Sequence, residues 1–233
     1  MLSMKKYDHI FFDLDHTLWD FSTNCAETLS ELYTEHRLQN LGISSDAFIV
    51  AYRTINDKMW SDFHHGKITK EEIRDKRFLY TFELLKLDVS DIPAEIDKQF
   101  LEICPTKSNV FPHTFEVLDY LSKHYQMHIL TNGFSETQFI KVQSAKLEPY
   151  FKHVIHSEMS GHLKPDKRMF DYALDMANTK AQHSIMIGDD LFADVLGAKN
   201  AGMAQVFINR NKEQHTESIT HEIDCLSTLK TFL

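Results

Sequence analysis

Cysteine is scarce in this chain of 233 residues. The three cysteines, Cys25, Cys104 and Cys225, are far apart and form no CxxC pair. This pattern argues against a disulfide scaffold and a structural zinc site, and it is typical of proteins from a reducing compartment. The first residues, MLSMKKYD, contain no apolar segment of the kind found in signal peptides. We therefore expect the protein to be cytoplasmic.

Long apolar runs and an excess of basic residues are also missing. The longest apolar runs span only a few residues, as in Ile10–Phe12, which is too short to cross a membrane. The 34 Asp and Glu residues outnumber the 25 Lys and Arg residues, and the net charge of −9 disfavours nucleic acid as a partner. With 42% hydrophobic residues, the composition is that of an ordinary globular protein with a full core.

Glycine and proline are few, at 7 and 5 residues, so long uninterrupted elements are expected. Short runs rich in Ile, Val, Phe and Met predict five buried strands. These strands are Tyr7–Asp13, Met127–Thr131, His153–His156, Ser184–Gly188 and Ala204–Ile208. Helical patterns separate the last four, over Glu136–Ala145, Lys167–Ala177 and Leu191–Ala201. Strands that alternate with helices predict an α/β fold, namely a doubly wound parallel sheet with helices on both faces.

The segment between the first two strands is too long for a single crossover. Asp15 and Thr131 are 116 positions apart, whereas a strand–helix–strand unit needs about 30 residues. Helical patterns fill the extra segment, over Phe21–Leu38, Asp46–Phe63, Thr69–Leu87 and Ile92–Cys104. We therefore predict an all-helical domain over residues 18–106, inserted into a core formed by residues 1–17 and 107–233. Its place after the first strand is that of a lid.

The strongest chemical feature is DLDHTL, Asp13–Leu18, which directly follows the apolar segment IFF. Asp13 and Asp15 leave a buried strand, where an unpaired carboxylate is costly unless a cation or hydrogen-bond donors compensate it. A solvated strand end is the alternative for an isolated acidic pair. His16 lies where the chain must turn sharply, and histidine tolerates a positive φ better than most residues. Ligands of parallel sheets bind at this carboxyl end of the strands.

Three further features follow predicted strands in chain order. TNG, Thr131–Gly133, places a hydroxyl and backbone amides where they form either an anion-binding corner or an ordinary helix N-cap. Lys164 precedes Pro165, which favours an extended backbone at the lysine; a surface lysine is the alternative. GDDLFAD, Gly188–Asp194, concentrates carboxylates after the fourth strand, where they favour either Mg²⁺ or a helix N-terminus.

Together and in this order, these features resemble the four motifs of the haloacid dehalogenase (HAD) superfamily of phosphotransferases. DLDHTL is similar to motif I (DxDx[TV]) and Gly188–Asp194 to motif IV (GDxxxxD), while Thr131 and Lys164 stand for motifs II and III. The resemblance covers the whole chain, because the helical insertion is similar to the superfamily's type C1 cap domain. It implies a Rossmann-like core and a small-molecule phosphate ester as the substrate.

The resemblance also implies roles for the acidic residues. Asp13 would attack phosphorus and form an aspartyl-phosphate. Asp15 would protonate the leaving oxygen and then deprotonate the water that hydrolyses the intermediate. The cofactor Mg²⁺ would be held by Asp13, the backbone carbonyl of Asp15 and Asp189.

The remaining motif residues would support this chemistry. Thr131 and the backbone amide of Asn132 would bind phosphoryl oxygens, and Lys164 would offset the negative charge of the phosphoryl group and of the nucleophile. Asp194 and Asp190 would support the site from behind these residues.

Motif I separates the reactions known in the superfamily. Hydrolytic dehalogenases lack the second aspartate because a halide leaving group needs no proton, so Asp15 disfavours dehalogenation. Phosphonatases usually lack this acid as well, and P-type ATPases carry DKT together with membrane helices. A phosphatase or a phosphomutase remains.

Three segments, FFDLDHTLWDF, TNGF and GDDLFADVLGAKNAG, resemble the bacterial pyrimidine 5′-nucleotidase branch. The implied substrate is a nucleoside 5′-monophosphate. Trp19 and Phe21 follow the catalytic loop, where they either stack on a base or pack as a hydrophobic hinge. The alternatives are a phosphatase or mutase for another small ester, such as a sugar phosphate or phosphoglycolate, and a non-catalytic binding protein. The intact acidic and lysine residues disfavour the last of these.

Overall fold

The computed structural model describes residues 6–233. The chain divides into two compact units. The first contains the residues up to Phe21 together with Ser108–Leu233, and the second contains Ser22–Lys107. The first cut therefore falls after residue 21, whereas the sequence prediction placed it after residue 17.

Backbone pairing explains why residues 18–20 stay with the first unit. The amide of Phe111 donates to the carbonyl of Leu18, at 2.9 Å, and the amide of Asp20 donates to the carbonyl of Asn109, at 3.1 Å. The outgoing and returning chain segments thus hold each other, which satisfies backbone groups that an open linker would expose to water.

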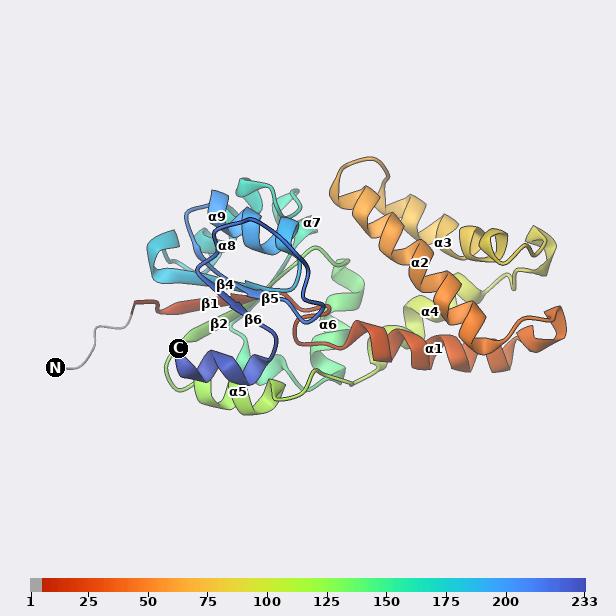
Figure 1. Ribbon diagram of the computed structural model, residues 1–233, viewed down its shortest axis with the longest axis horizontal. Coiled ribbons are helices and arrows are strands. Elements are labelled where there is room, and N and C mark those ends of the chain that lie inside the picture. Colours follow the sequence, from red (N-terminus) through yellow and green to blue (C-terminus); the bar gives the residue numbers. More distant parts are fainter. Residues whose placement is uncertain (1–5) are drawn as a thin grey trace. The chain divides into compact units, whose positions relative to one another are not determined.

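The first unit is built on a parallel sheet (Figure 1). Within residues 6–233 this sheet has six strands in the order β3-β2-β1-β4-β5-β6. The strands are β1 His9–Phe12, β2 Gln126–Thr131, β3 His153–His156, β4 Ser184–Gly188, β5 Ala204–Ile208 and β6 His221–Ile223. The first five were predicted from their apolar runs, but β6 was missed because its three residues, HEI, carry no such run. The strand order reverses between β1 and β4, which is where ligands bind in doubly wound sheets.

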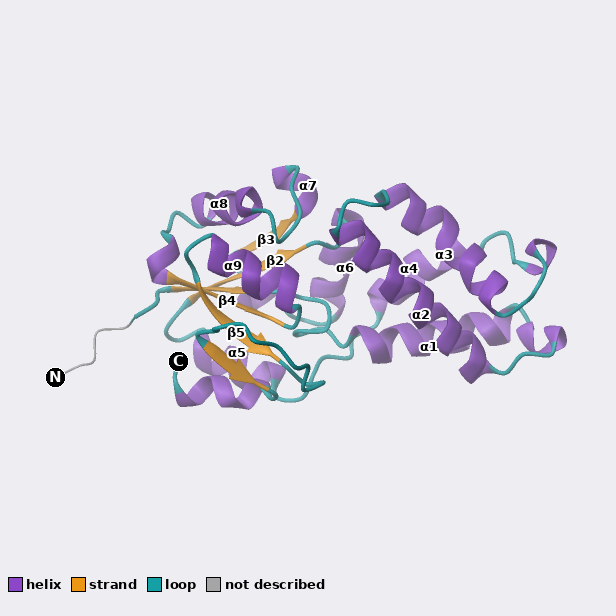
Figure 2. Cartoon of the chain, turned by 45° about the horizontal axis from the view of Figure 1, so that its top comes forward, coloured by secondary structure: helices purple, strands orange, loops and turns teal. Residues whose placement is uncertain are grey.

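Helices cover both faces of this sheet (Figure 2). Helices α8 (Lys167–Met176) and α9 (Gly197–Asn200) lie on one face, and α5 (Thr114–Leu121) lies on the other. On the first face Phe11 of β1 and Met186 of β4 pack in one cluster with Phe170 of α8, all fully buried. Each such side chain contributes about 1.5–3 kcal/mol by leaving water.

The predicted helix over Leu191–Ala201 is divided. A π-helical segment, Leu191–Leu196, precedes the short helix α9. This unit also contains the α-helices α6, Ser135–Ser144, and α7, Ser157–Ser160.

The second unit is helical. Its helices are α1 Phe21–Glu35, α2 Ser45–His64, α3 Lys70–Leu84 and α4 Ile96–Ile103. Helix α3 begins with a capping box, because the Thr69 side chain accepts from the Glu72 amide and the Glu72 side chain accepts from the Thr69 amide. Aromatic rings fill the core of the unit, with Tyr52 and Phe78 fully buried at a centroid distance of 5.1 Å. Among the described residues, no helix is long and apolar enough to span a membrane.

Three histidines form a row near the amino ends of β1, β2 and β3. The ring centroids of His9 and His128 are 5.4 Å apart, and those of His128 and His153 are 5.3 Å apart, with nearly parallel planes. His9 Nδ1 and His128 Nε2 share a hydrogen bond of 3.1 Å. Burial, followed by the charges of His9 and His153, lowers the pKa of His128 from 6.5 to about 3.

We predict that this row destabilises the protein in acid. His128 stays neutral in the folded state but takes up a proton in the unfolded state below pH 6.5, so stability falls as the pH drops from 6.5 toward 3. In the His128→Leu variant, the free energy of unfolding should fall less steeply with decreasing pH, by about 1.4 kcal/mol per pH unit, because one proton fewer is taken up on unfolding. Urea unfolding at several pH values between 4 and 7 measures it. The exposed His124→Leu variant is the control, and equal slopes for His128→Leu and the wild type would contradict the prediction.

Candidate active site

The acidic motif residues meet at the carboxyl ends of β1 and β4. Asp13 directly follows β1 and Asp189 directly follows β4, and these strands are paired in register from His9–Ser184 to Phe12–Ile187. Asp194 joins them from the π-helical segment. One carboxylate oxygen from each of Asp13, Asp189 and Asp194 lies within 4.8 Å of the others. The structure therefore brings together two motifs that are 176 positions apart in the chain, from Asp13 to Asp189.

Lys164 connects this acidic cluster to β2. Its Nζ donates to Asp13 Oδ1 at 2.7 Å, to Asp194 Oδ1 at 2.6 Å and to the backbone carbonyl of Leu130 at 2.7 Å. These three acceptors match the three N–H donors of an ammonium group. The side chain is only 2% exposed, so Lys164 is not a surface lysine.

Burial is the largest cause of the pKa shifts of the three carboxyl groups in the cluster. It raises the pKa of Asp13 and raises that of Asp194 to about 7, although the Lys164 ammonium opposes both shifts. Burial and the charge of Asp13 raise the pKa of Asp189 well above its usual value. Burial disfavours the charge of Lys164, but Asp13 and Asp194 outweigh burial and raise its pKa.

This donor set fits a divalent cation. When all three carboxyls are ionised, the single ammonium leaves two negative charges uncompensated, so a further cation would be bound favourably, and oxygen ligands suit Mg²⁺. Both oxygens of Asp194 already accept hydrogen bonds, Oδ1 from Lys164 and Oδ2 from the Asp190 amide at 3.1 Å. Asp13 and Asp189 are therefore the carboxylates better placed to bind such a cation.

Asp15 points into a different environment. Its two carboxylate oxygens accept hydrogen bonds of 2.7 and 2.8 Å from Lys141 Nζ, and Oδ2 also accepts one of 3.0 Å from Gln138 Nε2. Burial favours the neutral acid, but Lys141 and Gln138 together outweigh it and lower the pKa of Asp15. The next residue, His16, has a φ of 61°, which confirms the sharp turn expected there.

Asn132 of the second motif holds the backbone of Lys164 in place. The Asn132 side chain donates to the Lys164 carbonyl at 2.9 Å and accepts from the Lys164 amide at 2.8 Å. Thr131 Oγ1 accepts from the Gly133 amide at 3.0 Å. The predicted role of the Asn132 backbone amide concerned phosphate, whereas its side chain has this second, positioning contact that the sequence did not indicate.

Two contacts explain the presence of Gly188 and Asp190 in motif IV. A Cβ atom on Gly188 would lie 2.1 Å from Asp194 Oδ2, so only glycine leaves room for that carboxylate. Asp190 Oδ1 accepts from the amides of Phe192 and Ala193, both at 2.8 Å, and so caps the π-helical segment.

Sequence reasoning did not single out Thr17, Gln138, Lys141 and Arg210, of which the first three contact predicted site residues and the last binds the loop after β1. Thr17 Oγ1 donates to Asp189 Oδ1 at 2.9 Å. The Arg210 guanidinium donates to the carbonyls of His16 and Thr17, at 2.6 and 3.1 Å. Two signals were available: Thr17 occupies the last position of the DxDx[TV] pattern, and the spacing of Gln138 and Lys141 places them on one face of the helix that follows Thr131.

The two aromatic residues after the catalytic loop differ in exposure. Trp19 has no exposed surface, and the Lys141 ammonium lies 4.7 Å from its ring centroid. Phe21 is half-buried, with its ring centroid 5.7 Å from the same ammonium. Of the two, only Phe21 presents surface on which a base could stack.

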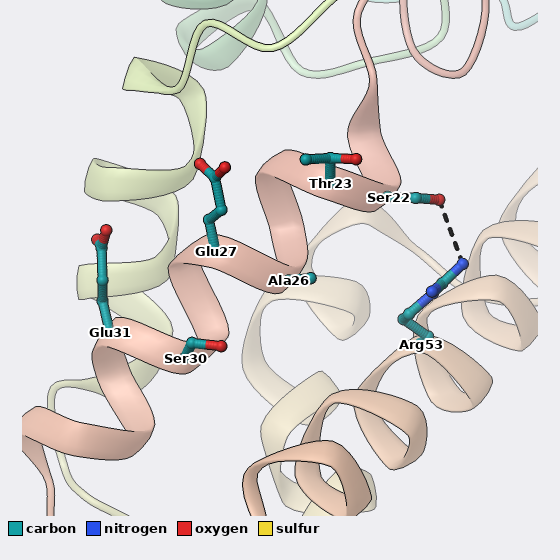
Figure 3. Close-up of a pocket in the computed structure, with 7 residues that line it drawn as sticks. All are labelled: Ser22, Thr23, Ala26, Glu27, Ser30, Glu31 and Arg53. Atoms are coloured by element: carbon teal, nitrogen blue, oxygen red, sulfur yellow. Dashed lines mark hydrogen bonds between the residues drawn. The ribbon is translucent and has the colours of Figure 1, made fainter. Parts of the chain in front are cut away.

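The second unit carries a separate open depression between α1 and α2 (Figure 3). Arg53 Nη2 donates there to Ser22 Oγ at 3.2 Å. The lining residues are Ser22, Thr23, Ala26, Glu27, Ser30, Glu31 and Arg53. None of them was predicted as a site residue.

Comparison with known families identifies the class of protein. A family model described as haloacid dehalogenase-like hydrolase matches residues 7–202. The chain therefore belongs to this family and is an enzyme of the hydrolase class. The resemblance inferred from the four motifs is confirmed.

Particular relatives are similar over most of their length. YfnB of Bacillus subtilis, which is assigned to the HAD hydrolases, is 29% identical over 97% of this chain and 95% of its own. The pyrimidine 5′-nucleotidase YjjG of Escherichia coli is 29% identical over 98% of each chain. A glyceraldehyde 3-phosphate phosphatase of Pyrococcus furiosus is 30% identical over 90% of this chain and 83% of its own.

A crystal structure of YfnB has the same fold. It was determined with bound magnesium and is described as revealing interdomain movement. It matches this chain with a TM-score of 0.86 and 28% identity, covering 97% of this chain and 98% of that one. The predicted fold class, a doubly wound α/β core with a helical insertion, is confirmed.

We predict that Asn132→Leu lowers the free energy of unfolding. The change leaves the buried amide and carbonyl of Lys164 without their partner, which costs about 1–3 kcal/mol for each group. Urea unfolding measures the loss, with the exposed Asn200→Leu variant as the control. An Asn132→Leu variant as stable as that control would show that the two hydrogen bonds are not needed.

Proposed function

We propose that the protein is a Mg²⁺-dependent phosphomonoester hydrolase that works through an aspartyl-phosphate on Asp13. The observation that carries this proposal is the position of Asp13. Its Oδ1 accepts a hydrogen bond from Lys164, and its carboxylate lies in one cluster with that of Asp189. Asp15 follows two positions later in the same loop. A nucleophile beside compensating charge, with a second carboxyl group nearby for proton transfer, suits phosphoryl transfer to a carboxylate.

The chain's own residues would divide the work as follows. A carboxylate approaching a phosphate meets repulsion, and the Lys164 ammonium, 2.7 Å from Asp13 Oδ1, reduces it. Asp13, the backbone carbonyl of Asp15 and Asp189 would hold Mg²⁺. When bound, the ion supplies further positive charge to the phosphoryl oxygens. Thr131 and the Asn132 amide would orient the phosphoryl group, and Asp15 would move the protons.

The substrate that we propose is a nucleoside 5′-monophosphate with a pyrimidine base. Support comes from the relative YjjG, a pyrimidine 5′-nucleotidase that matches this chain end to end, and from the half-buried ring of Phe21 beside the loop. A small sugar phosphate is the second candidate, because a relative at 30% identity is named a glyceraldehyde 3-phosphate phosphatase.

We predict Mg²⁺-dependent phosphate release from UMP, dUMP and dTMP in preference to AMP, glucose 6-phosphate, β-glucose 1-phosphate, glyceraldehyde 3-phosphate and phosphoglycolate. Phosphate assay over time measures hydrolysis, and product analysis detects an isomerised ester. The Asp13→Asn variant should lose on the order of 10³-fold or more in kcat, because the amide is not a nucleophile.

Each other outcome of this assay changes the proposal. Preference for a sugar phosphate would replace the substrate but keep the nucleophile. An isomerised product would indicate a mutase. Turnover that survives in Asp13→Asn would overturn the mechanism.

We also predict that Mg²⁺ stabilises the folded protein. Binding between uncompensated carboxylates adds about 2.7 kcal/mol at a concentration of one hundred times Kd. Thermal unfolding in Mg²⁺ and in EDTA measures the shift. The Asp189→Asn variant should lose most of it, yet be at least as stable as the wild type in EDTA because one buried charge is gone. The exposed Asp175→Asn variant should keep the full shift, and an undiminished shift in Asp189→Asn would contradict the assigned ligand.

A further inference from the structure

The Asp15 carboxylate is bound by two side chains from one face of helix α6. Lys141 Nζ lies 2.7 and 2.8 Å from its two carboxylate oxygens, and Gln138 Nε2 lies 3.0 Å from Oδ2. Gln138 and Lys141 are three positions apart, so both project from the same side of the helix. Because α6 begins shortly after Thr131 at the end of β2, these hydrogen bonds link the loop after β1 to the loop after β2.

Lys141 is itself held in place by its surroundings. Its side chain is 8% exposed, and its ammonium lies 4.7 Å from the ring centroid of the buried Trp19 and 5.7 Å from that of Phe21. Aromatic faces attract a cation, and more strongly when water is excluded. The ammonium is thus held by two rings while it donates to both oxygens of one carboxylate.

The Gln138 side chain lies directly against the backbone of Gly133. A Cβ atom on Gly133 would lie 1.3 Å from Gln138 Nε2. The Gln138 amide therefore occupies the space that any other residue at 133 would fill. Gly133, whose neighbour Asn132 binds the backbone of Lys164, makes room for the residue that holds Asp15.

We propose that Lys141 and Gln138 are positioning residues that hold the Asp15 carboxyl group in place for proton transfer. This inference rests on the proposed phosphatase function. Lys141 and Gln138 favour the carboxylate form of Asp15 by lowering its pKa, and the negative charge of the arriving phosphate favours uptake of a proton from solvent. As an Asp13 oxygen bonds to phosphorus, the ester P–O bond breaks and the leaving oxygen takes this proton from Asp15. In the second step water bonds to phosphorus, the bond between Asp13 and phosphorus breaks, and the water proton returns to Asp15. The same carboxyl group must therefore be correctly oriented twice.

A purely structural ion pair makes a different prediction. If the Lys141–Asp15 pair only joined α6 to the loop, its loss would lower stability and slow every substrate alike. If it positions Asp15, its loss slows mainly those substrates whose leaving oxygen needs a proton. An alkyl phosphate such as UMP needs one, whereas p-nitrophenyl phosphate does not, because p-nitrophenolate is a weak base.

The test compares kcat/KM for UMP and for p-nitrophenyl phosphate, since this ratio reports the steps up to departure of the leaving group. If the panel shows another preferred alkyl phosphate, that ester replaces UMP. Lys141→Met should lower kcat/KM for UMP by about 100-fold, the cost of a misplaced group, and change that for p-nitrophenyl phosphate little. Release of p-nitrophenolate should also acquire a burst, because the hydrolytic step still needs Asp15 as the base.

Two further variants make the result specific. Lys141→Arg keeps a donor for both carboxylate oxygens and should recover most of the UMP activity. Gln138→Leu removes only the neutral donor and should give a smaller loss that is again selective for UMP, and it tests the inference even if Lys141→Met does not fold. The control is Lys167→Met, which breaks an exposed Lys–Asp pair on α8 and should leave both substrates unaffected.

The outcomes separate the inference from the function on which it rests. Equal losses for both substrates in Lys141→Met and Gln138→Leu, or no loss in either, would overturn the positioning role while Asp13-dependent turnover by the wild type stands. No hydrolysis of either substrate by the wild type would overturn the proposed function, and the positioning role with it.

Discussion

The buried ammonium of Lys164 is the interaction on which the rest of the first unit depends. It joins the end of β1, the Leu130 carbonyl of β2 and the π-helical segment after β4 through three short hydrogen bonds. Removal of the charge would leave Asp13 and Asp194 buried without a cation, and a broken buried pair typically costs about 3–5 kcal/mol. At least two neighbouring residues support this contact. Asn132 fixes the backbone of the lysine, and Gly188 leaves space for Asp194.

A second group of contacts surrounds the loop between Asp13 and Trp19. His16 adopts a left-handed conformation, which costs energy for a residue with a side chain and persists only where neighbours enforce it. Arg210 supplies part of that enforcement by binding the carbonyls of His16 and Thr17, and its guanidinium lies 3.7 Å from the ring centroid of Phe111. The loop is thus held from the segment after β5, from the returning linker and from α6.

The sequence predicted those parts of the structure that depend on local pattern. Five strands showed as apolar runs, and the motif residues could be placed together because they follow parallel strands whose carboxyl ends meet at one edge. Contacts that depend on the rotation of a helix or the path of a loop left no such trace. The pairing of Lys141 with Asp15 requires the phase of α6, and the reach of Arg210 requires the path of the chain after β5. Strand β6 escaped because an edge strand of three residues has too little apolar surface to stand out.

The row of histidines lies at the opposite end of the sheet from the acidic cluster, and this separation affects how a pH–rate profile should be interpreted. Protonation of the unfolded chain at His128 draws molecules away from the folded population below pH 6.5. A fall in activity on the acid side can then arise some distance from the reacting groups, through the number of folded molecules rather than the rate of each. Dividing measured rates by the folded fraction at each pH would leave the part of the profile that belongs to the chemistry.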